Sequence, residues 1–123
     1  MAQYSELPVY KAAYDLLLQV FGLVHNLSRE YKYSLGEKLK NENTELLSNI
    51  YRANRTTKKN EHLEKARENL ELVRLYIRIL KDTQQIGMKR YVSINQNMEG
   101  VSKQLAGWHK SVQNQAHSQS YPG

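Results

Sequence analysis

Apolar residues recur at spacings of three and four along most of this chain, which is the period of an amphipathic α-helix. Four segments show the pattern, and no segment shows the alternation of two that is typical of a strand. The predicted inner faces are Val9, Ala12, Ala13, Leu16, Leu17, Val20, Leu23, Val24 and Leu27; Leu39, Leu46, Ile50 and Ala53; Leu63, Ala66, Leu70, Val73, Ile77 and Leu80; and Ile94, Met98, Val101, Leu105, Trp108 and Val112.

Residues that favour helix starts precede each segment. Pro8 suits the first turn of the first helix. Ser34 with Glu37, and Ser93 with Gln96, have the spacing of a capping box, and Asn60 is a good cap for the third helix. Between Pro8 and Pro122 there is no proline, so long helices are expected.

These elements predict an all-α fold, an antiparallel up-and-down four-helix bundle formed by residues 1–112. Polar Asn43 interrupts the inner face of the second helix. Residues 113–123 lack a periodic apolar face, so we expect this C-terminal tail to fray or to be disordered.

The third predicted helix carries a second apolar patch on its other side, formed by Leu72, Leu75, Tyr76 and Ile79. Neighbouring helices of the same bundle could cover it. Alternatively it is a subunit interface, which the charged first half of that side, at Glu61, Lys65 and Glu68, favours slightly. We expect a homo-oligomer.

Composition narrows the function classes. The chain has 123 residues, a formal net charge of +6 and no cysteine. It is long enough for one core, and thiol chemistry and disulfides are excluded. No apolar stretch approaches the roughly 20 residues of a membrane span, and the N-terminus lacks the pattern of a secretory signal, so we expect a cytoplasmic protein with no membrane partner.

The positive charge gathers in two parts of the chain, residues 32–59 and 72–123. Clustered cations attract the phosphates of nucleic acids without base-specific contacts. The alternative is a solvated helix face on which Glu64, Glu68 and Glu71 neutralise the cations. The predicted phosphate ligands are Arg52, Arg55, Lys59, Arg67, Arg74, Arg78 and Lys81.

Signatures of catalysis and of metal binding are absent from the sequence. There is no glycine-rich phosphate loop, no His-Glu-x-x-His and no Gly-x-Ser-x-Gly. We therefore expect no enzyme activity, no cofactor and no metal. For the four histidines, His25, His62, His109 and His117, we expect surface or capping roles. Trp108 is expected to close one end of the core.

Four stretches together resemble the four-helix-bundle family of 23S rRNA intervening-sequence proteins, and within it the accessory variability determinants of diversity-generating retroelements. They are Tyr33-Ser-Leu-Gly-Glu-Lys-Leu39, Leu47-Ser-Asn-Ile-Tyr-Arg-Ala53, Leu75-Tyr-Ile-Arg-Ile-Leu80 and Gln104-Leu-Ala-Gly-Trp108. The resemblance implies a homopentameric barrel, a basic surface for nucleic acid, a reverse transcriptase as partner in the retroelement branch, and no catalytic activity.

Two function hypotheses follow. The first is a non-enzymatic, RNA-linked, nucleic-acid-binding homo-oligomer whose cations neutralise backbone phosphates. The second is a protein-interaction scaffold that binds itself, or a partner such as a reverse transcriptase, while its cations only maintain solubility. An enzyme with an unrecognised site is a third reading, but no acid, base and nucleophile can be placed together.

Overall fold

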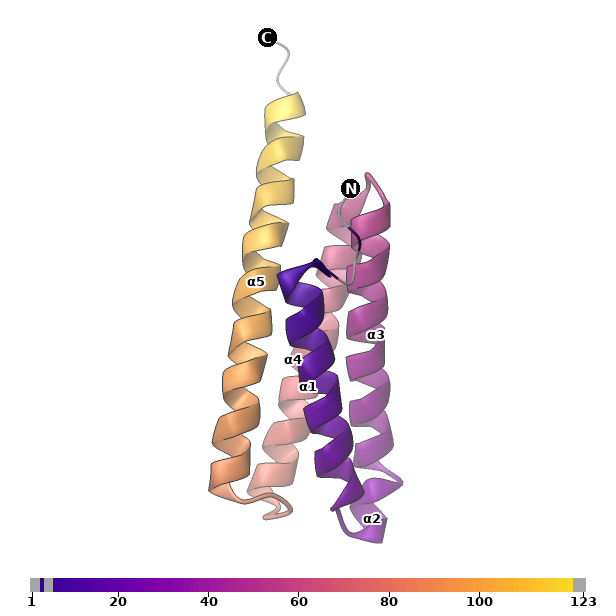
Figure 1. Cartoon of the computed structure of the whole chain (residues 1–123), viewed down its shortest axis with the longest axis vertical. Coiled ribbons are helices and arrows are strands. Elements are labelled where there is room, and N and C mark those ends of the chain that lie inside the picture. Colours follow the sequence, from indigo (N-terminus) through magenta and orange to yellow (C-terminus); the bar gives the residue numbers. More distant parts are fainter. Residues whose placement is uncertain (1–2, 4–5, 121–123) are drawn as a thin grey trace.

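The computed structural model describes residue 3 and residues 6–120. Its elements are α1 (Pro8–His25), α2 (Arg29–Lys32), α3 (Leu35–Arg55), α4 (Lys59–Asp82) and α5 (Met88–Ser120). The four long helices run alternately up and down, and α2 is a single turn between α1 and α3 (Figure 1). The all-α four-helix fold predicted from the sequence is confirmed.

Each long helix occupies one corner of the bundle. Helix α1 packs against α3 and α5, and α4 packs against the same two helices from the other side. In Figure 1, α1 accordingly lies in front of α4. Because α1 and α4 stand at opposite corners, side chains on their outward faces point to opposite sides of the molecule.

The core consists mainly of the predicted inner faces, although Ala12 and Leu17 are only half-buried and Leu47, which was not predicted, is buried. Leu16, Leu46, Ile77 and Leu105 are typical members, each with no exposed surface, and Trp108 and Val112 pack against the core while half-buried. Asn43 is equally buried, and neither of its amide atoms hydrogen-bonds to another residue within the described part of the chain.

Gly36 allows the start of α3 to approach the end of α1 closely. A Cβ atom at this position would lie 2.8 Å from Cγ1 of Val24 and 3.1 Å from the carbonyl oxygen of Tyr31. Both distances are shorter than ordinary van der Waals contact, so a residue without a side chain is required where the first turn of α3 meets the end of α1.

The predicted caps at Ser34, Asn60 and Ser93 do not form. Ser34 precedes α3, but its hydroxyl donates to the carbonyl of Glu30 at 2.7 Å and so serves the end of α2. Asn60 and Ser93 lie inside helices, because α4 begins at Lys59 and α5 at Met88. The sequence did not indicate α2, which supplies the competing carbonyl for Ser34.

Helix α4 ends in a turn that would usually contain glycine. Gln84 follows the cap residue Thr83 and adopts a φ of 62°, the left-handed region. The backbone N–H of Gln85 donates to the carbonyl of Leu80 at 2.8 Å, which closes a Schellman-type turn.

Helix α5 continues past the expected boundary at residue 112 and ends at Ser120. Residues 113–120 are therefore helical, in contrast to the expected tail, and this part of α5 projects beyond the other helices (Figure 1). Neither glycine nor proline occurs between Gly107 and Pro122, so nothing in the sequence stops the helix earlier. Residues 121–123 lie outside the described residues.

Candidate nucleic-acid interface

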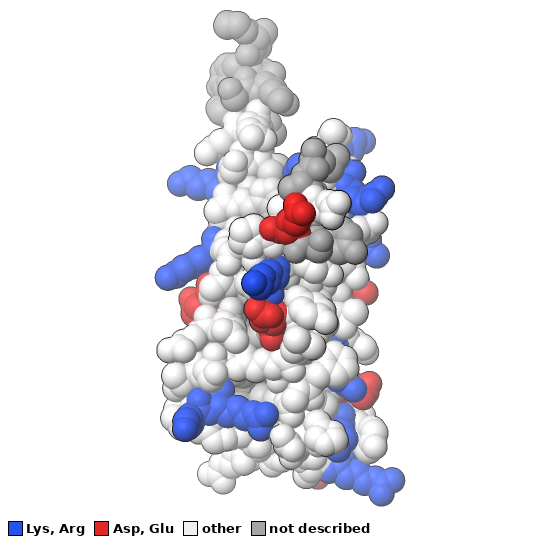
Figure 2. All heavy atoms as spheres, in the orientation of Figure 1, with Lys and Arg blue, Asp and Glu red and all other residues white. Residues whose placement is uncertain are grey.

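Three exposed cations surround the turn between α3 and α4: Arg52, Arg55 and Lys58, which we call the turn cluster. Within the described residues none of the three forms an ion pair with a carboxylate. The Arg55 guanidinium lies 5.6 Å from the centroid of the Tyr51 ring. In Figure 2 basic side chains gather over this end of α3, at the upper right. The cluster therefore keeps its full positive charge.

Lys59, the neighbouring predicted phosphate ligand, has a structural role in this turn. Its Nζ atom donates to the carbonyl oxygens of Ala53 at 2.7 Å and Thr56 at 2.8 Å. The last carbonyls of a helix lack intrahelical partners, so this half-buried ammonium completes the end of α3.

Four of the predicted phosphate ligands lie on α4, and acids neutralise two of them. We call these four residues the basic strip: Arg67, Arg74, Arg78 and Lys81. Nη1 of Arg74 lies 2.6 Å from Oε1 of Glu99 on α5. Its Nε atom is 3.5 Å from Oε1 of Glu71, an ion pair without hydrogen-bond geometry. The Arg74 side chain is only 25% exposed, so little of its charge is available to a ligand.

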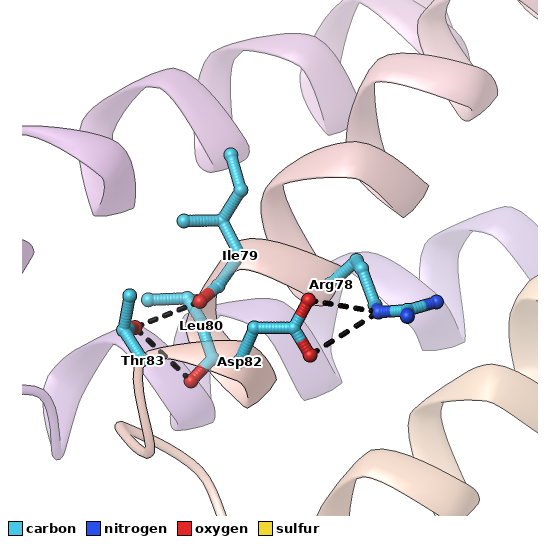
Figure 3. A network of polar contacts seen from close by, with 5 residues as sticks. All are labelled: Arg78, Ile79, Leu80, Asp82 and Thr83. Atoms are coloured by element: carbon cyan, nitrogen blue, oxygen red, sulfur yellow. Dashed lines mark hydrogen bonds and ion pairs between the residues drawn. The ribbon is translucent and has the colours of Figure 1, made fainter.

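Arg78 is neutralised in the same way, whereas the partner of Lys81 is an aromatic ring. Nε of Arg78 donates to both carboxylate oxygens of Asp82, at 3.2 and 3.0 Å, beside the hydroxyl of Thr83 that caps the end of α4 (Figure 3). Nζ of Lys81 lies 4.7 Å from the centroid of the Tyr91 ring. Of the acids expected to neutralise the strip, Glu71 does so, and Glu99 and Asp82 supply the other carboxylates among the described residues.

Arg67, the remaining strip residue, is held by His109. Nη1 of Arg67 lies 2.9 Å from Nδ1 of the imidazole, and Nε2 lies 2.7 Å from Oδ1 of Asn60. His109 is 4% exposed, so the expected surface or capping role is wrong for this histidine. The side chain of His117 lies outside those described.

The apolar patch on α4 is only partly covered by its own bundle. Tyr76 packs against the core and Ile79 is half-buried, but Leu72 and Leu75 are 37% and 50% exposed. A hollow of about 490 Å³ lies beside Leu72, and one of about 340 Å³ lies beside Leu75. Glu71 lines both hollows, and charged side chains line them together with the apolar ones; we call the two hollows along α4 and α5 the α4–α5 groove.

A second exposed apolar surface lies on α1 and was not predicted. Tyr14, Leu18 and Phe21 are 45%, 54% and 47% exposed and follow one another at four and three residues, so they form one stripe, the α1 face. Figure 2 views the molecule from this side, and much of the surface over the middle of α1 is uncharged. The spacing of Tyr14, Leu18 and Phe21 could be seen in the sequence. Because this helix has so many apolar residues, the sequence did not show which of them point outward.

The described residues contain neither a metal-binding cluster nor a membrane-spanning helix. Histidine and acidic side chains do not gather anywhere in groups that could hold a metal ion. None of the described helices is both long and apolar enough to cross a membrane.

Comparison with known proteins identifies the family. The model of the bAvd-like family (bacterial accessory variability determinant) matches residues 8–112, which is most of the chain. A crystal structure of a protein of unknown function from the S23 ribosomal protein family of Bacteroides thetaiotaomicron superposes with a TM-score of 0.76. The two chains are 20% identical, and the match covers 83% of this chain and 95% of the other. No curated protein matches.

Because the two chains are only 20% identical, the similarity to this crystal structure supports the fold alone. The family model covers α1, α3 and α4 and reaches residue 112 of α5, and the resemblance drawn from the sequence motifs is confirmed. The chain belongs to the bAvd-like family.

Proposed function

We propose that this chain is a non-enzymatic subunit of a homo-oligomer that binds the phosphate backbone of nucleic acid, and that this nucleic acid is RNA. The observation that carries the proposal is the turn cluster, in which Arg52, Arg55 and Lys58 are exposed and free of carboxylate partners among the described residues. Such unneutralised cations release condensed counterions when they meet phosphates. Membership of the bAvd-like family supports the proposal.

The predicted cations differ in how much they can contribute to phosphate binding, because their partners in the structure differ. Arg74 and Arg78 are neutralised by Glu99 and Asp82, so they contribute less to phosphate binding than the turn cluster. Arg67 and Lys81 lie between these extremes, because His109 and the Tyr91 ring hold them without cancelling their charge.

Self-association is supported by two unlike surfaces that each contain exposed apolar residues. The α1 face and the α4–α5 groove lie on opposite sides of the bundle. Large exposed apolar residues at spacings of four and three are the anchors with which a helix enters a groove. We place the α1 face of one copy in the α4–α5 groove of the next, a head-to-tail contact that closes into a ring. A ring of five, and a reverse transcriptase as its partner, are what the family resemblance implies.

Fluorescence anisotropy with a short labelled RNA duplex, repeated across a salt series, tests the binding proposal. Wild-type protein should bind and lose affinity steeply as salt rises. The double variant Arg55→Gln, Lys58→Gln should bind more weakly and flatten the salt dependence by a slope of about 2, since each phosphate contact contributes about 0.9.

Arg78→Gln is the matched control, because it removes one positive charge that Asp82 already neutralises. It should change the affinity and the salt slope only slightly. Equal effects of the two sets of substitutions would overturn the assignment to the turn cluster. A multimer by light scattering that ignores RNA at low salt would instead support the protein-interaction scaffold, for which the exposed apolar surfaces are the favouring observation.

A further inference from the structure

The outer side of the α3–α4 pair contains a hollow of about 350 Å³ that has only polar or charged side chains in its lining. Most of the lining residues are exposed, so the hollow opens to solvent. We call it the polar hollow. The side chains that carry the argument are Asn49 and Arg52 from α3 and His62, Lys65 and Asn69 from α4.

Two asparagines form the floor. Asn49 is 4% exposed, and its Nδ2 atom donates to Oδ1 of Asn69 at 2.7 Å. Nδ2 of Asn69 in turn donates to Oε2 of Glu42 at 2.9 Å. A buried amide is costly unless it is hydrogen-bonded, so this relay fixes the orientation of both carboxamides. Each amide nitrogen has two hydrogens, which leaves one on each for a ligand.

Arg52 and His62 leave further hydrogen-bonding capacity unused. Nη1 of Arg52 makes a long contact of 3.4 Å to Oδ1 of Asn49, and a guanidinium has five N–H donors in all. Nδ1 of His62 is buried and hydrogen-bonds to no other described residue. The hollow therefore offers amide and guanidinium N–H donors, with the carboxylates of Glu45 and Glu68 as acceptors.

The charges of the lining indicate which kind of ligand fits. The lining contains two cations, Arg52 and Lys65, and two carboxylates, Glu45 and Glu68, so its formal charges sum to zero. None of the four forms an ion pair with another member of the lining among the described residues, and Lys65 forms its ion pair with Glu61, at 3.3 Å. A balanced lining does not favour a bare anion. It suits a neutral group that donates and accepts hydrogen bonds and has a flat face on which a guanidinium can stack, as a nucleobase has.

The polar hollow also joins the turn cluster. Arg52 belongs to both, and Arg55 is one helical turn further along α3. A strand whose phosphates meet Arg55 and Lys58 would thus bring an adjacent base to the hollow. Paired bases cannot enter it, because their hydrogen-bonding edges are already occupied within a duplex.

We propose that the polar hollow receives an unpaired nucleobase of a bound RNA, a specificity that rests on the function proposed above. Amide groups of Asn49 and Asn69 read the edge of the base, and Arg52 stacks on its face. The protein then prefers single-stranded RNA to a duplex with the same number of phosphates.

The experiment compares two labelled RNAs, a short single strand of mixed sequence and a duplex of equal phosphate count, by fluorescence anisotropy at one salt concentration. Asn69→Ala should weaken binding of the single strand about tenfold, in line with loss of one good base contact, and leave duplex binding unchanged. Asn41→Ala, at an exposed asparagine of α3 that does not line the hollow, is the matched control and should change neither.

A second variant guards against a folding defect in Asn69→Ala. Glu45→Leu, at an exposed position of the lining, replaces a carboxylate acceptor with an apolar side chain and removes a negative charge. Removal of a negative charge should by itself strengthen the binding of RNA. Weaker binding of the single strand by this variant therefore cannot be an effect of net charge. If both variants bind the two RNAs as wild type does, while Arg55→Gln, Lys58→Gln still weakens both, the hollow is not a base site and the proposed function stands. If wild-type protein binds neither RNA, both proposals are overturned.

Discussion

His109 on α5 and Arg67 on α4 lie 42 residues apart in the sequence, and their side chains meet at 2.9 Å between Nδ1 and Nη1. A guanidinium can only donate, so Nδ1 is the acceptor and the ring carries its hydrogen on Nε2. That hydrogen is donated to Oδ1 of Asn60 at 2.7 Å. The imidazole thereby bridges two positions of α4 at the last buried turn described for α5.

Replacing His109 should destabilise the bundle. His109→Leu replaces the imidazole with an apolar side chain of similar size and leaves Oδ1 of Asn60 and Nη1 of Arg67 without this partner, so a loss of about 1–3 kcal/mol in the free energy of unfolding is expected. Urea denaturation followed by circular dichroism measures it. His25→Leu, at an exposed histidine, is the control and should stay within about 0.5 kcal/mol of wild type. Equal stabilities of the two variants would contradict the bridging role.

Glycine is required at one helical position and unfavourable at another. Gly36→Ala should cost about 1–3 kcal/mol, because the added Cβ would lie 2.8 Å from Val24 and 3.1 Å from the backbone of Tyr31. Gly100→Ala, on α5 with no heavy atom within 4 Å of the added Cβ, should stabilise by about 0.5–1 kcal/mol. Thermal melts of the two variants should therefore shift in opposite directions, and a shift in the same direction would refute the close approach of α3 to α1.

The end of α4 offers a stabilising substitution. Gln84 has a φ of 62°, which costs a residue with a side chain about 1 kcal/mol relative to glycine. Gln84→Gly should raise the melting temperature by a few degrees. Gln85→Gly, at the next position and without a positive φ, should lower it or leave it unchanged. A gain from Gln85→Gly alone would show that the turn is closed differently.

The inner faces of the helices could be predicted because burial in a bundle imposes one periodicity on many residues at once. Leu63 through Leu80 on α4 is an example, in which every predicted inner residue is buried. Helix starts were predicted less well. A serine hydroxyl caps a helix by bonding to a backbone N–H of the first turn, and a nearby backbone carbonyl can take that hydroxyl as its donor instead. Ser34 bonds to Glu30 of the unexpected α2 and not to the first turn of α3.

The sequence could predict which basic residues belong to the candidate site. It could not predict which of them are neutralised by a neighbouring carboxylate. The sequence named Arg74 and Arg78 with Arg52 and Arg55, yet only the fold shows that Glu99 from α5 reaches Arg74. The rotation of α5 about its axis decides such contacts, and it also decides that His109 points inward. The polar hollow could not be predicted either, because Asn49 and Asn69 meet only when α3 and α4 pack.

The opposite placement of α1 and α4 gives each subunit a polarity, so its assembly can be blocked from one side at a time. A copy with Leu18→Asp has lost its α1 face but still has an intact groove, and a copy with Leu75→Asp has the reverse defect. Alone, each should remain a monomer. Mixed in equal amounts, they should form one intact junction and stop at two copies, which light scattering would detect as a dimer. A contact made through like faces would instead leave one of the two variants assembling by itself.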